Sequence, residues 1–140
     1  MNTNSFTFNG ERKNYINILR GRERPPWASI QRNLVYTPGR PGAYVTESTV
    51  QVRYIRVPIG IEGKDRKDLQ KVKEDLAHWL VHEEPKELIF DDEPDRVYLA
   101  LVEDTVFFDE ISNLGEGILT FICPDPFKYS TNESYTEFPT

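Results

Sequence analysis

The spacing of apolar residues along the chain predicts a domain built mainly of short β-strands. The clearest stretch spans residues 49–59, where apolar side chains occupy alternate positions. The alternation changes phase once within it, between Tyr54 and Ile55, and such a change indicates a β-bulge or a new packing partner. Further strands are expected at residues 6–8, 15–18, 27–36, 87–90, 97–102, 106–108 and 117–123.

One helix is predicted, from about residue 65 to residue 82. Its apolar side chains recur at helical spacing and form a single stripe that consists of Leu69, Val72, Leu76, Trp79 and Leu80. Asp65 is expected to cap the first turn, and Asp68 suits the positive end of the helix dipole. A stripe of this width fits a helix that lies on a sheet. The predicted fold class is therefore α+β, a mainly antiparallel β-sandwich or barrel with one flanking helix.

Proline and glycine residues mark the turns and the end of this domain. Pro25 and Pro26 interrupt any regular element, and residues 37–42 form a Pro- and Gly-rich loop that is expected to be exposed. The last residues are polar with scattered aromatics, which is typical of an arm that packs against a partner. We therefore expect one domain over residues 1–128, followed by a linker or arm over residues 129–140.

Composition narrows the class of protein. The 140 residues, of which 38% are hydrophobic and 12% aromatic, are enough for one soluble globular domain with its own core. The formal net charge of −6 argues against binding to the phosphate backbone of nucleic acids. Many arginines occur up to Arg40, whereas acidic residues concentrate between Asp65 and Asp109. This asymmetry fits either solvated charge on separate faces or head-to-tail pairing with a neighbouring copy.

The chain carries no signal for an oxidising compartment or a membrane. Cys123 is the single cysteine, so no disulfide within the chain is possible, and a buried, inert thiol is expected. The chain begins without a basic and apolar signal segment, and no run approaches the roughly 18 apolar residues of a membrane helix. We expect a protein that is made and folded in a cytoplasm and does not enter a membrane.

Two histidines are the first candidates for chemistry. His78 and His82 stand four residues apart on the predicted helix, a spacing that could hold a metal ion. The pattern is not H-E-x-x-H, both side chains fall outside the apolar stripe, and Cys123 is the only further nitrogen or sulfur ligand. Solvated histidines explain these positions better, and the sequence predicts no metal or cofactor.

Residues 91–95 form an acidic cluster around Pro94. The spacing lacks the central glycine and distal glutamate of a calcium loop, and catalytic carboxylates usually come from separate elements across a cleft. A turn whose side chains pair with Arg96 or with a neighbouring subunit explains the cluster better. The chain also lacks a G-x-S-x-G motif and a phosphate-binding loop. We therefore expect no enzymatic activity.

Five segments, in this order, resemble the distal tail protein family of siphophages and prophages. They are the opening strand and turn 6–10, the strand 53–59, the helix ending near 79–80, the stretch 87–98 with its D-E-P-D-R-V-Y motif, and 121–129 with its C-P-D-P-F motif. The resemblance implies the fold of the tail tube protein, with a β-sandwich, a flanking helix and an extended hairpin that meets the next subunit. We expect that hairpin within residues 21–50, around 38–42.

The same resemblance implies a structural role in the virion. Family members form a hexameric ring at the distal end of the tail tube and join the tube to tail tip, fibre or baseplate proteins, while DNA passes through without specific binding. For this chain it implies a homo-oligomer in the phage tail that is made in the host bacterial cytoplasm. Members usually carry a second, galectin-like domain. An acidic subunit fits this role, because it would not retain a passing polyanion.

A closed ring requires one patch of each subunit to meet a different patch of the next. The candidate interface residues are charged and come mainly from the early basic segment and the acidic turn: Arg22, Arg24, Arg40, Asp92, Glu93 and Arg96. Arg22 or Arg24 would pair with Asp92 or Glu93. Two alternatives stay open: a stand-alone carbohydrate- or peptide-binding β-module that uses Trp27, Tyr36 and Tyr44, and a tail-tip hydrolase with two convergent carboxylates.

Overall fold

The structure is a computed structural model that describes residues 4–19 and 25–130. Along these ranges the chain forms β1 (Phe6–Phe8), β2 (Ile16–Ile18), β3 (Ile30–Val35), β4 (Tyr44–Val50), β5 (Arg53–Glu62), α1 (Arg66–Leu80), β6 (Lys86–Phe90), β7 (Arg96–Val102), β8 (Asp109–Ile111), β9 (Leu114–Cys123) and β10 (Tyr129–Ser130). Every pairing between these strands is antiparallel.

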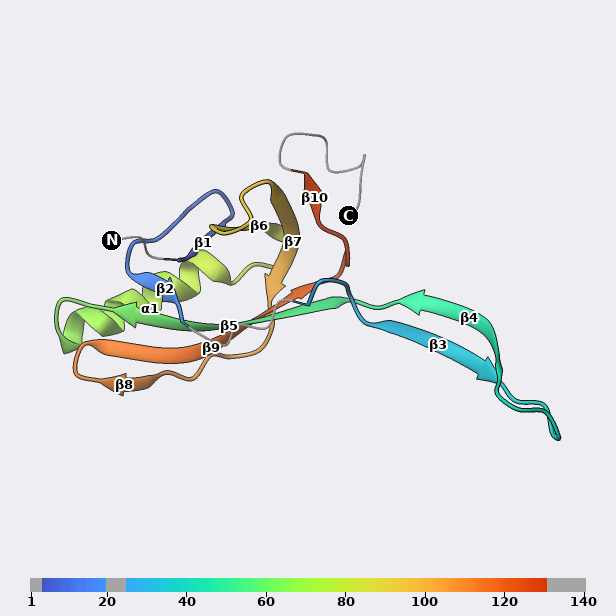
Figure 1. Cartoon of the computed structure of the whole chain (residues 1–140). Helices are drawn as coiled ribbons and strands as arrows, with labels where there is room; N and C mark the ends of the chain where they lie inside the picture. The colour runs from blue at the N-terminus through green and yellow to red at the C-terminus, as the bar shows by residue number, and fades with distance from the viewer. Residues whose placement is uncertain (1–3, 20–24, 131–140) are drawn as a thin grey trace.

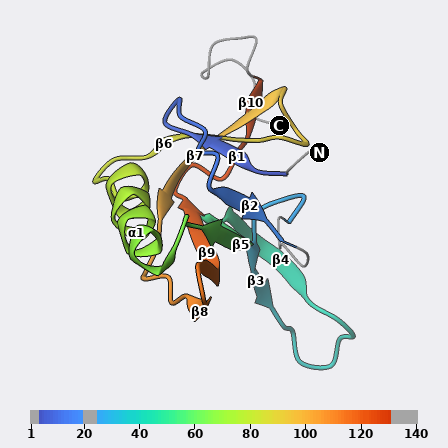
Figure 2. The ribbon, with the colours of Figure 1, turned by 90° about the vertical axis from the view of Figure 1, so that its left-hand side faces the viewer.

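The strands make one large sheet and one separate hairpin (Figure 1). The large sheet has the order β1-β6-β7-β9-β5-β2, with β10 added to β7 and β8 added to β9. Within the described ranges, strands β3 and β4 pair only with each other. The helix covers one face of the sheet (Figure 2). The predicted α+β fold, mainly antiparallel with one flanking helix, is confirmed.

The long ladder between β5 and β9 is the centre of the sheet. It runs from the pair Arg53 and Cys123 to the pair Glu62 and Leu114. Odd-numbered β5 residues are buried and even-numbered ones face outward. The expected single strand at 49–59 is wrong: β4 ends at Val50, and β5 begins three residues later. The chain leaves the hairpin and joins the sheet at residues 51–52, so the change of apolar phase between Tyr54 and Ile55 lies just inside β5.

Aromatic side chains hold the helix against the N-terminal strand. Phe6 stacks on Trp79 with ring centroids 5.3 Å apart and an interplanar angle of 6°. Phe121 meets Phe6 edge to face, at 5.6 Å and 84°. The indole nitrogen of Trp79 donates to the carbonyl oxygen of Phe8 at 2.9 Å, so the polar end of this large side chain is satisfied within the core.

The helix begins and ends much as its sequence predicts. The carboxylate of Asp65 accepts a hydrogen bond from the backbone N–H of Asp68 at 2.8 Å. In return, the Asp68 carboxylate accepts a hydrogen bond from the backbone N–H of Lys64 at 2.7 Å. The two aspartate side chains therefore satisfy backbone N–H groups on both sides of the start of the helix. The expected apolar stripe is buried in full. No helix in the described ranges has the length and apolar character needed to cross a membrane.

The connection between β7 and β9 differs from the prediction. Residues 106–108 were expected to form a strand, but the strand in this region is β8, at Asp109–Ile111. Instead, this segment lies over Gly117: a Cβ atom there would come within 2.8 Å of the carbonyl oxygen of Phe107. The absent side chain lets the loop pack onto the sheet, a tertiary contact that alternation along the chain does not reveal.

Candidate assembly surface

The β3–β4 hairpin projects from the body of the molecule (Figures 1 and 2). Six pairs join its strands, from Ile30 opposite Val50 to Val35 opposite Tyr44. Every residue from 29 to 50 is exposed. The hairpin expected within residues 21–50 is therefore present. Both of its faces are uncovered in the single chain.

One face of the hairpin is aliphatic. Ile30 and Val50 form its first pair and Leu34 and Val45 its last, and these four side chains are between 40% and 57% exposed. Between them lies Arg32, whose guanidinium donates to the hydroxyl of Ser48 at 2.9 Å. This face, defined by these six residues, is called the hairpin apolar face below. Its pattern is apolar, basic, apolar.

A β-bulge at Thr46 creates this arrangement. The register shifts between Asn33 and Leu34, so that Leu34 lies opposite Val45 and Thr46 is left over. The hydroxyl of Thr46 donates to the carbonyl oxygen of Asn33 at 3.2 Å. Without the extra residue, Val45 would point to the other side of the ribbon from Val50. Simple alternation along the sequence assigns Val45 and Val50 to opposite sides, so it does not predict this face.

The opposite face is polar near the base, and near the tip it carries the pair of Val35 with Tyr44. Gln31, Asn33, Glu47 and Thr49 occupy its first two pairs. The amide nitrogen of Asn33 lies 3.4 Å from a carboxylate oxygen of Glu47. The two faces of the hairpin thus differ in chemistry, which means that a partner would meet them in one orientation.

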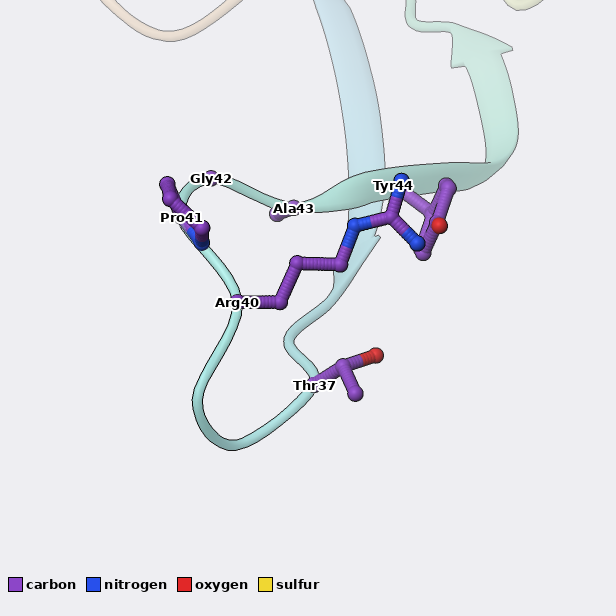
Figure 3. Close-up of a pocket in the computed structure, with 6 residues that line it drawn as sticks. All are labelled: Thr37, Arg40, Pro41, Gly42, Ala43 and Tyr44. Atoms are coloured by element: carbon purple, nitrogen blue, oxygen red, sulfur yellow. The ribbon is translucent and has the colours of Figure 1, made fainter.

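The tip of the hairpin is a tight loop organised by Arg40 (Figure 3). Its backbone N–H donates to the carbonyl oxygen of Thr37 at 3.2 Å, and its guanidinium lies 4.6 Å from the ring centroid of Tyr44. Gly39 and Gly42 both have a φ of +78°, a conformation that glycine adopts without strain. The hollow enclosed here is only about 60 Å³, well below a typical ligand pocket.

Arg53 anchors the base of the hairpin. Its side chain is almost wholly buried, at 3% exposed. The guanidinium donates to the carbonyl oxygen of Pro126 at 2.9 Å and to that of Pro25 at 3.2 Å, and it lies 5.4 Å from the ring centroid of Tyr98. One side chain therefore ties the segment before the hairpin to the segment before β10. The sequence does not predict this role of Arg53, since its partners are backbone atoms that lie far away along the chain.

The acidic turn between β6 and β7 makes contacts within the chain. Asp91 accepts hydrogen bonds from the guanidinium of Arg12 and, at 3.0 Å, from the backbone N–H of Ser5. The hydrogen bond from Arg12 holds the pKa of the Asp91 carboxyl below its usual value. Glu93 accepts from the ammonium of Lys128 at 2.6 Å and from the hydroxyl of Tyr98 at 3.0 Å. These acids fix the turn to its own subunit.

The candidate interface residues are dispersed. Arg22 and Arg24 lie outside the described residues. Arg40 is at the hairpin tip, which projects away from the β6–β7 turn that contains Asp92 and Glu93 (Figure 1). Arg96 follows this turn and lies 3.7 Å from the carboxylate of Asp95. The single chain does not bring Arg40 to the acidic turn, so any pairing between them would join two copies.

The two histidines and Cys123 are the remaining candidates for metal binding or catalysis. The Nε2 atom of His82 lies 2.8 Å from the carbonyl oxygen of Trp79, and His78 is exposed. Within the described ranges, no group of three His, Cys, Asp or Glu side chains is placed to hold a metal ion. Cys123 is buried as expected, and burial raises the pKa of its thiol to about 12.

Most of the β-rich body, the flanking helix and the projecting hairpin lie within a stretch that matches one known protein family. Residues 11–123 match the family model of the phage tail protein RIFT-related domain. The chain therefore belongs to this family, and the resemblance to siphophage distal tail proteins is confirmed. It is a structural component of a virion tail.

A solved structure supports the fold. The chain is similar to the Dit protein of phage SPP1, described as a paradigm of the hub adsorption apparatus in phages that infect Gram-positive hosts. The two structures superpose with a TM-score of 0.80 at 22% sequence identity. The alignment covers 92% of this chain but 53% of that protein, so this chain spans about half its length. No curated protein matches the chain significantly.

Proposed function

We propose that this chain is a ring-forming subunit of the distal tail hub. Six copies would close a ring that joins the tail tube to tail tip, fibre or baseplate proteins, and DNA would pass through its channel unbound. The subunit would be made in the host bacterial cytoplasm and would have no catalytic role. In this proposal residues 1–128 supply the ring and residues 129–140 are the linker or arm, whose first two residues, Tyr129 and Ser130, pair with β7.

The exposed hairpin apolar face is the observation that carries the proposal. A two-stranded ribbon on its own is marginally stable in water, and exposed strands of this length invite pairing with another chain. Here the aliphatic side chains of both strands are gathered on one face by the bulge at Thr46. A surface of this kind, held on a rigid base by Arg53, fits a contact with a neighbouring subunit.

Charge supports the same role. The net charge of −6 suits a channel wall that does not retain a passing polyanion. The pairing of Arg22 or Arg24 with Asp92 or Glu93 of the next subunit remains part of the proposal. Glu93 already accepts from Lys128, so an arriving arginine would share this carboxylate. Exposed ion pairs contribute only about 0–1 kcal/mol each, so apolar burial would supply most of the ring's stability.

The alternative is a stand-alone carbohydrate- or peptide-binding module. Trp27 and Tyr36 are both largely exposed, as such a platform would require. A monomer that binds glycans or peptides through Trp27 would favour this role. The hydrolase alternative requires two convergent carboxylates, and the acids of the β6–β7 turn are instead engaged by Arg12, Lys128 and Tyr98.

Solution mass tests the proposal. Light scattering over a range of concentrations, with negative-stain imaging of the largest species, should give a mass that approaches six subunits and ring-shaped particles. The double variant Leu34→Ser, Val45→Ser should shift the chain towards monomer without unfolding it, since both side chains are exposed. The matched control, Gln31→Ser with Thr49→Ser on the opposite face, should assemble normally. A chain that stays monomeric at every concentration would overturn ring formation.

A further inference from the structure

A second uncovered apolar surface lies on the β5–β9 ladder, on the face opposite the helix. Ile118 is 60% exposed and Leu114 47% exposed, and Pro58 lies directly opposite Ile118. The buried partners in these strands, such as Leu119, face the helix side instead. Leu19 adds to this surface, since a Cβ atom on Gly60 would lie 3.4 Å from its side chain.

An acidic spot divides this surface. Glu116 pairs with Gly60, between the pair of Ile118 with Pro58 and the pair of Leu114 with Glu62. On its other side, Glu116 lies opposite Asp109 of β8. Like charges placed directly opposite each other repel, so this site favours an arriving cation. The surface formed by Leu19, Pro58, Gly60, Glu62, Asp109, Leu114, Glu116 and Ile118 is called the ladder face below.

The hairpin apolar face and the ladder face have partly complementary patterns. Along the hairpin, two aliphatic pairs flank Arg32; along the ladder, the apolar pair of Ile118 with Pro58 and the mixed pair of Leu114 with Glu62 flank Glu116. Both ribbons are antiparallel, so the same spacing of about 6.8 Å separates side chains two residues apart on each. Apolar side chains can therefore meet apolar ones while the single basic group meets the acidic spot.

We propose that the ladder face of one subunit receives the hairpin apolar face of the next, with Arg32 placed between Glu116 and Asp109. This inference rests on the proposed function, because it names the surface on which the ring contact forms. The occupant is a second copy, since the hairpin projects away from its own ladder (Figures 1 and 2). Two different patches meet, which is the head-to-tail geometry that a closed ring requires.

Charge reversal tests the ionic part. Arg32→Glu and Glu116→Lys should each raise the concentration for half-assembly about tenfold, because each places like charges together at the contact. The double variant restores an opposite pair between positions 32 and 116, although Asp109 stays acidic, so it should recover part of the loss and assemble at a lower concentration than either single variant. Glu47→Lys, on the opposite face of the hairpin, and Glu74→Lys, on the helix, are matched controls that should assemble normally.

Cysteine crosslinking tests the geometry. Leu34→Cys combined with either Ile118→Cys or Leu114→Cys should give reducible dimers and higher species on oxidation, and the combination that reacts tells which way the hairpin runs. Asn33→Cys with the same partners is the control, since Asn33 lies on the other hairpin face and should not react. The native Cys123 is buried and should not contribute.

The outcomes separate this inference from the proposed function. If the unmodified chain forms rings but the single reversals have no effect and neither cysteine combination crosslinks, the ladder face is not the acceptor and the ring stands. If the unmodified chain never assembles, ring formation itself is overturned. Partial restoration by the double reversal together with crosslinking to Ile118→Cys or Leu114→Cys would establish the contact.

Discussion

Trp79 donates its indole N–H to the carbonyl oxygen of Phe8 while its ring stacks on Phe6. The helix is thereby attached to the first strand of the sheet through one side chain, across more than seventy residues of sequence. This attachment positions the body from which the hairpin projects.

Replacement of Trp79 should destabilise the whole domain. Trp79→Ala removes a large buried ring and is expected to lower the free energy of unfolding by about 3–5 kcal/mol. Urea denaturation followed by circular dichroism would measure the change. Val81→Ala, at an exposed position just after the helix, is the control and should have almost no effect. Equal stability of the two variants would contradict the role given to Trp79.

Lysine should not be able to replace Arg53 in stabilising the fold. Arg53→Met leaves the carbonyl oxygens of Pro25 and Pro126 without this donor, and the loss of two partly buried hydrogen bonds should lower the free energy of unfolding by about 2–4 kcal/mol. Arg53→Lys should recover little, because an ammonium cannot reach two acceptors in the fork geometry of a guanidinium.

Hydrogen exchange distinguishes a local role for Arg53 from a general one. In Arg53→Lys, the amides of β10 and of the hairpin base should lose protection before those of α1. Arg56→Lys, on the exposed side of the same strand, should leave all three regions unchanged. A uniform loss of protection in Arg53→Lys would show that the residue does not tie these segments specifically.

Stability should fall at acidic pH in part through Asp91. Its pKa in the folded chain is lowered, chiefly by the hydrogen bond from Arg12, so its contribution is fully present above the unfolded pKa of about 3.9 and is lost as the pH falls through the lower folded value. Asp91→Asn should therefore be less stable than the original at neutral pH, and the difference should shrink below about pH 4. Thermal unfolding across this range would measure it. A difference that is constant with pH would contradict the assignment.

The thiol of Cys123 should be unreactive in the folded protein. With a pKa of about 12, only about one molecule in ten thousand carries the thiolate at pH 8, and the side chain is buried. A thiol-reactive dye should therefore label the chain only after denaturant unfolds it. Rapid labelling of the native protein would show that this strand opens readily.

Gly63 should not tolerate a side chain. A Cβ atom there would lie 2.5 Å from the backbone nitrogen of Leu69, so Gly63→Ala would displace the first turn of the helix. The expected loss is about 1–3 kcal/mol in the free energy of unfolding, as for other overpacked sites. Gly10→Ala is a useful comparison, because nothing lies within 4 Å of that site and only its φ of +81° opposes the change.

Local patterns predicted the elements that depend on near neighbours. The helix was predicted to within two residues at each end, because its stripe, its Asp65 cap and its apolar spacing all act within a few turns. The Pro- and Gly-rich residues 37–42 predicted an exposed loop, and the resemblance to siphophage distal tail proteins placed a hairpin around it. The strand at 106–108 was wrong: this segment packs over Gly117, which comes ten residues after Phe107, and the strand forms at Asp109–Ile111 instead.

For the assembly surface, too, the sequence predicts what depends on near neighbours and not what depends on strand pairing. The sequence by itself determined a β-rich domain with one helix, an exposed turn at residues 37–42 and a buried thiol, since each follows from side-chain chemistry at short range. Only the tertiary structure decided that Val45 and Val50 share a face, because a bulge at Thr46 resets the alternation. Only the tertiary structure placed Glu116 beside Asp109 and engaged Glu93 with Lys128, because strand pairing brings together residues that the chain keeps apart.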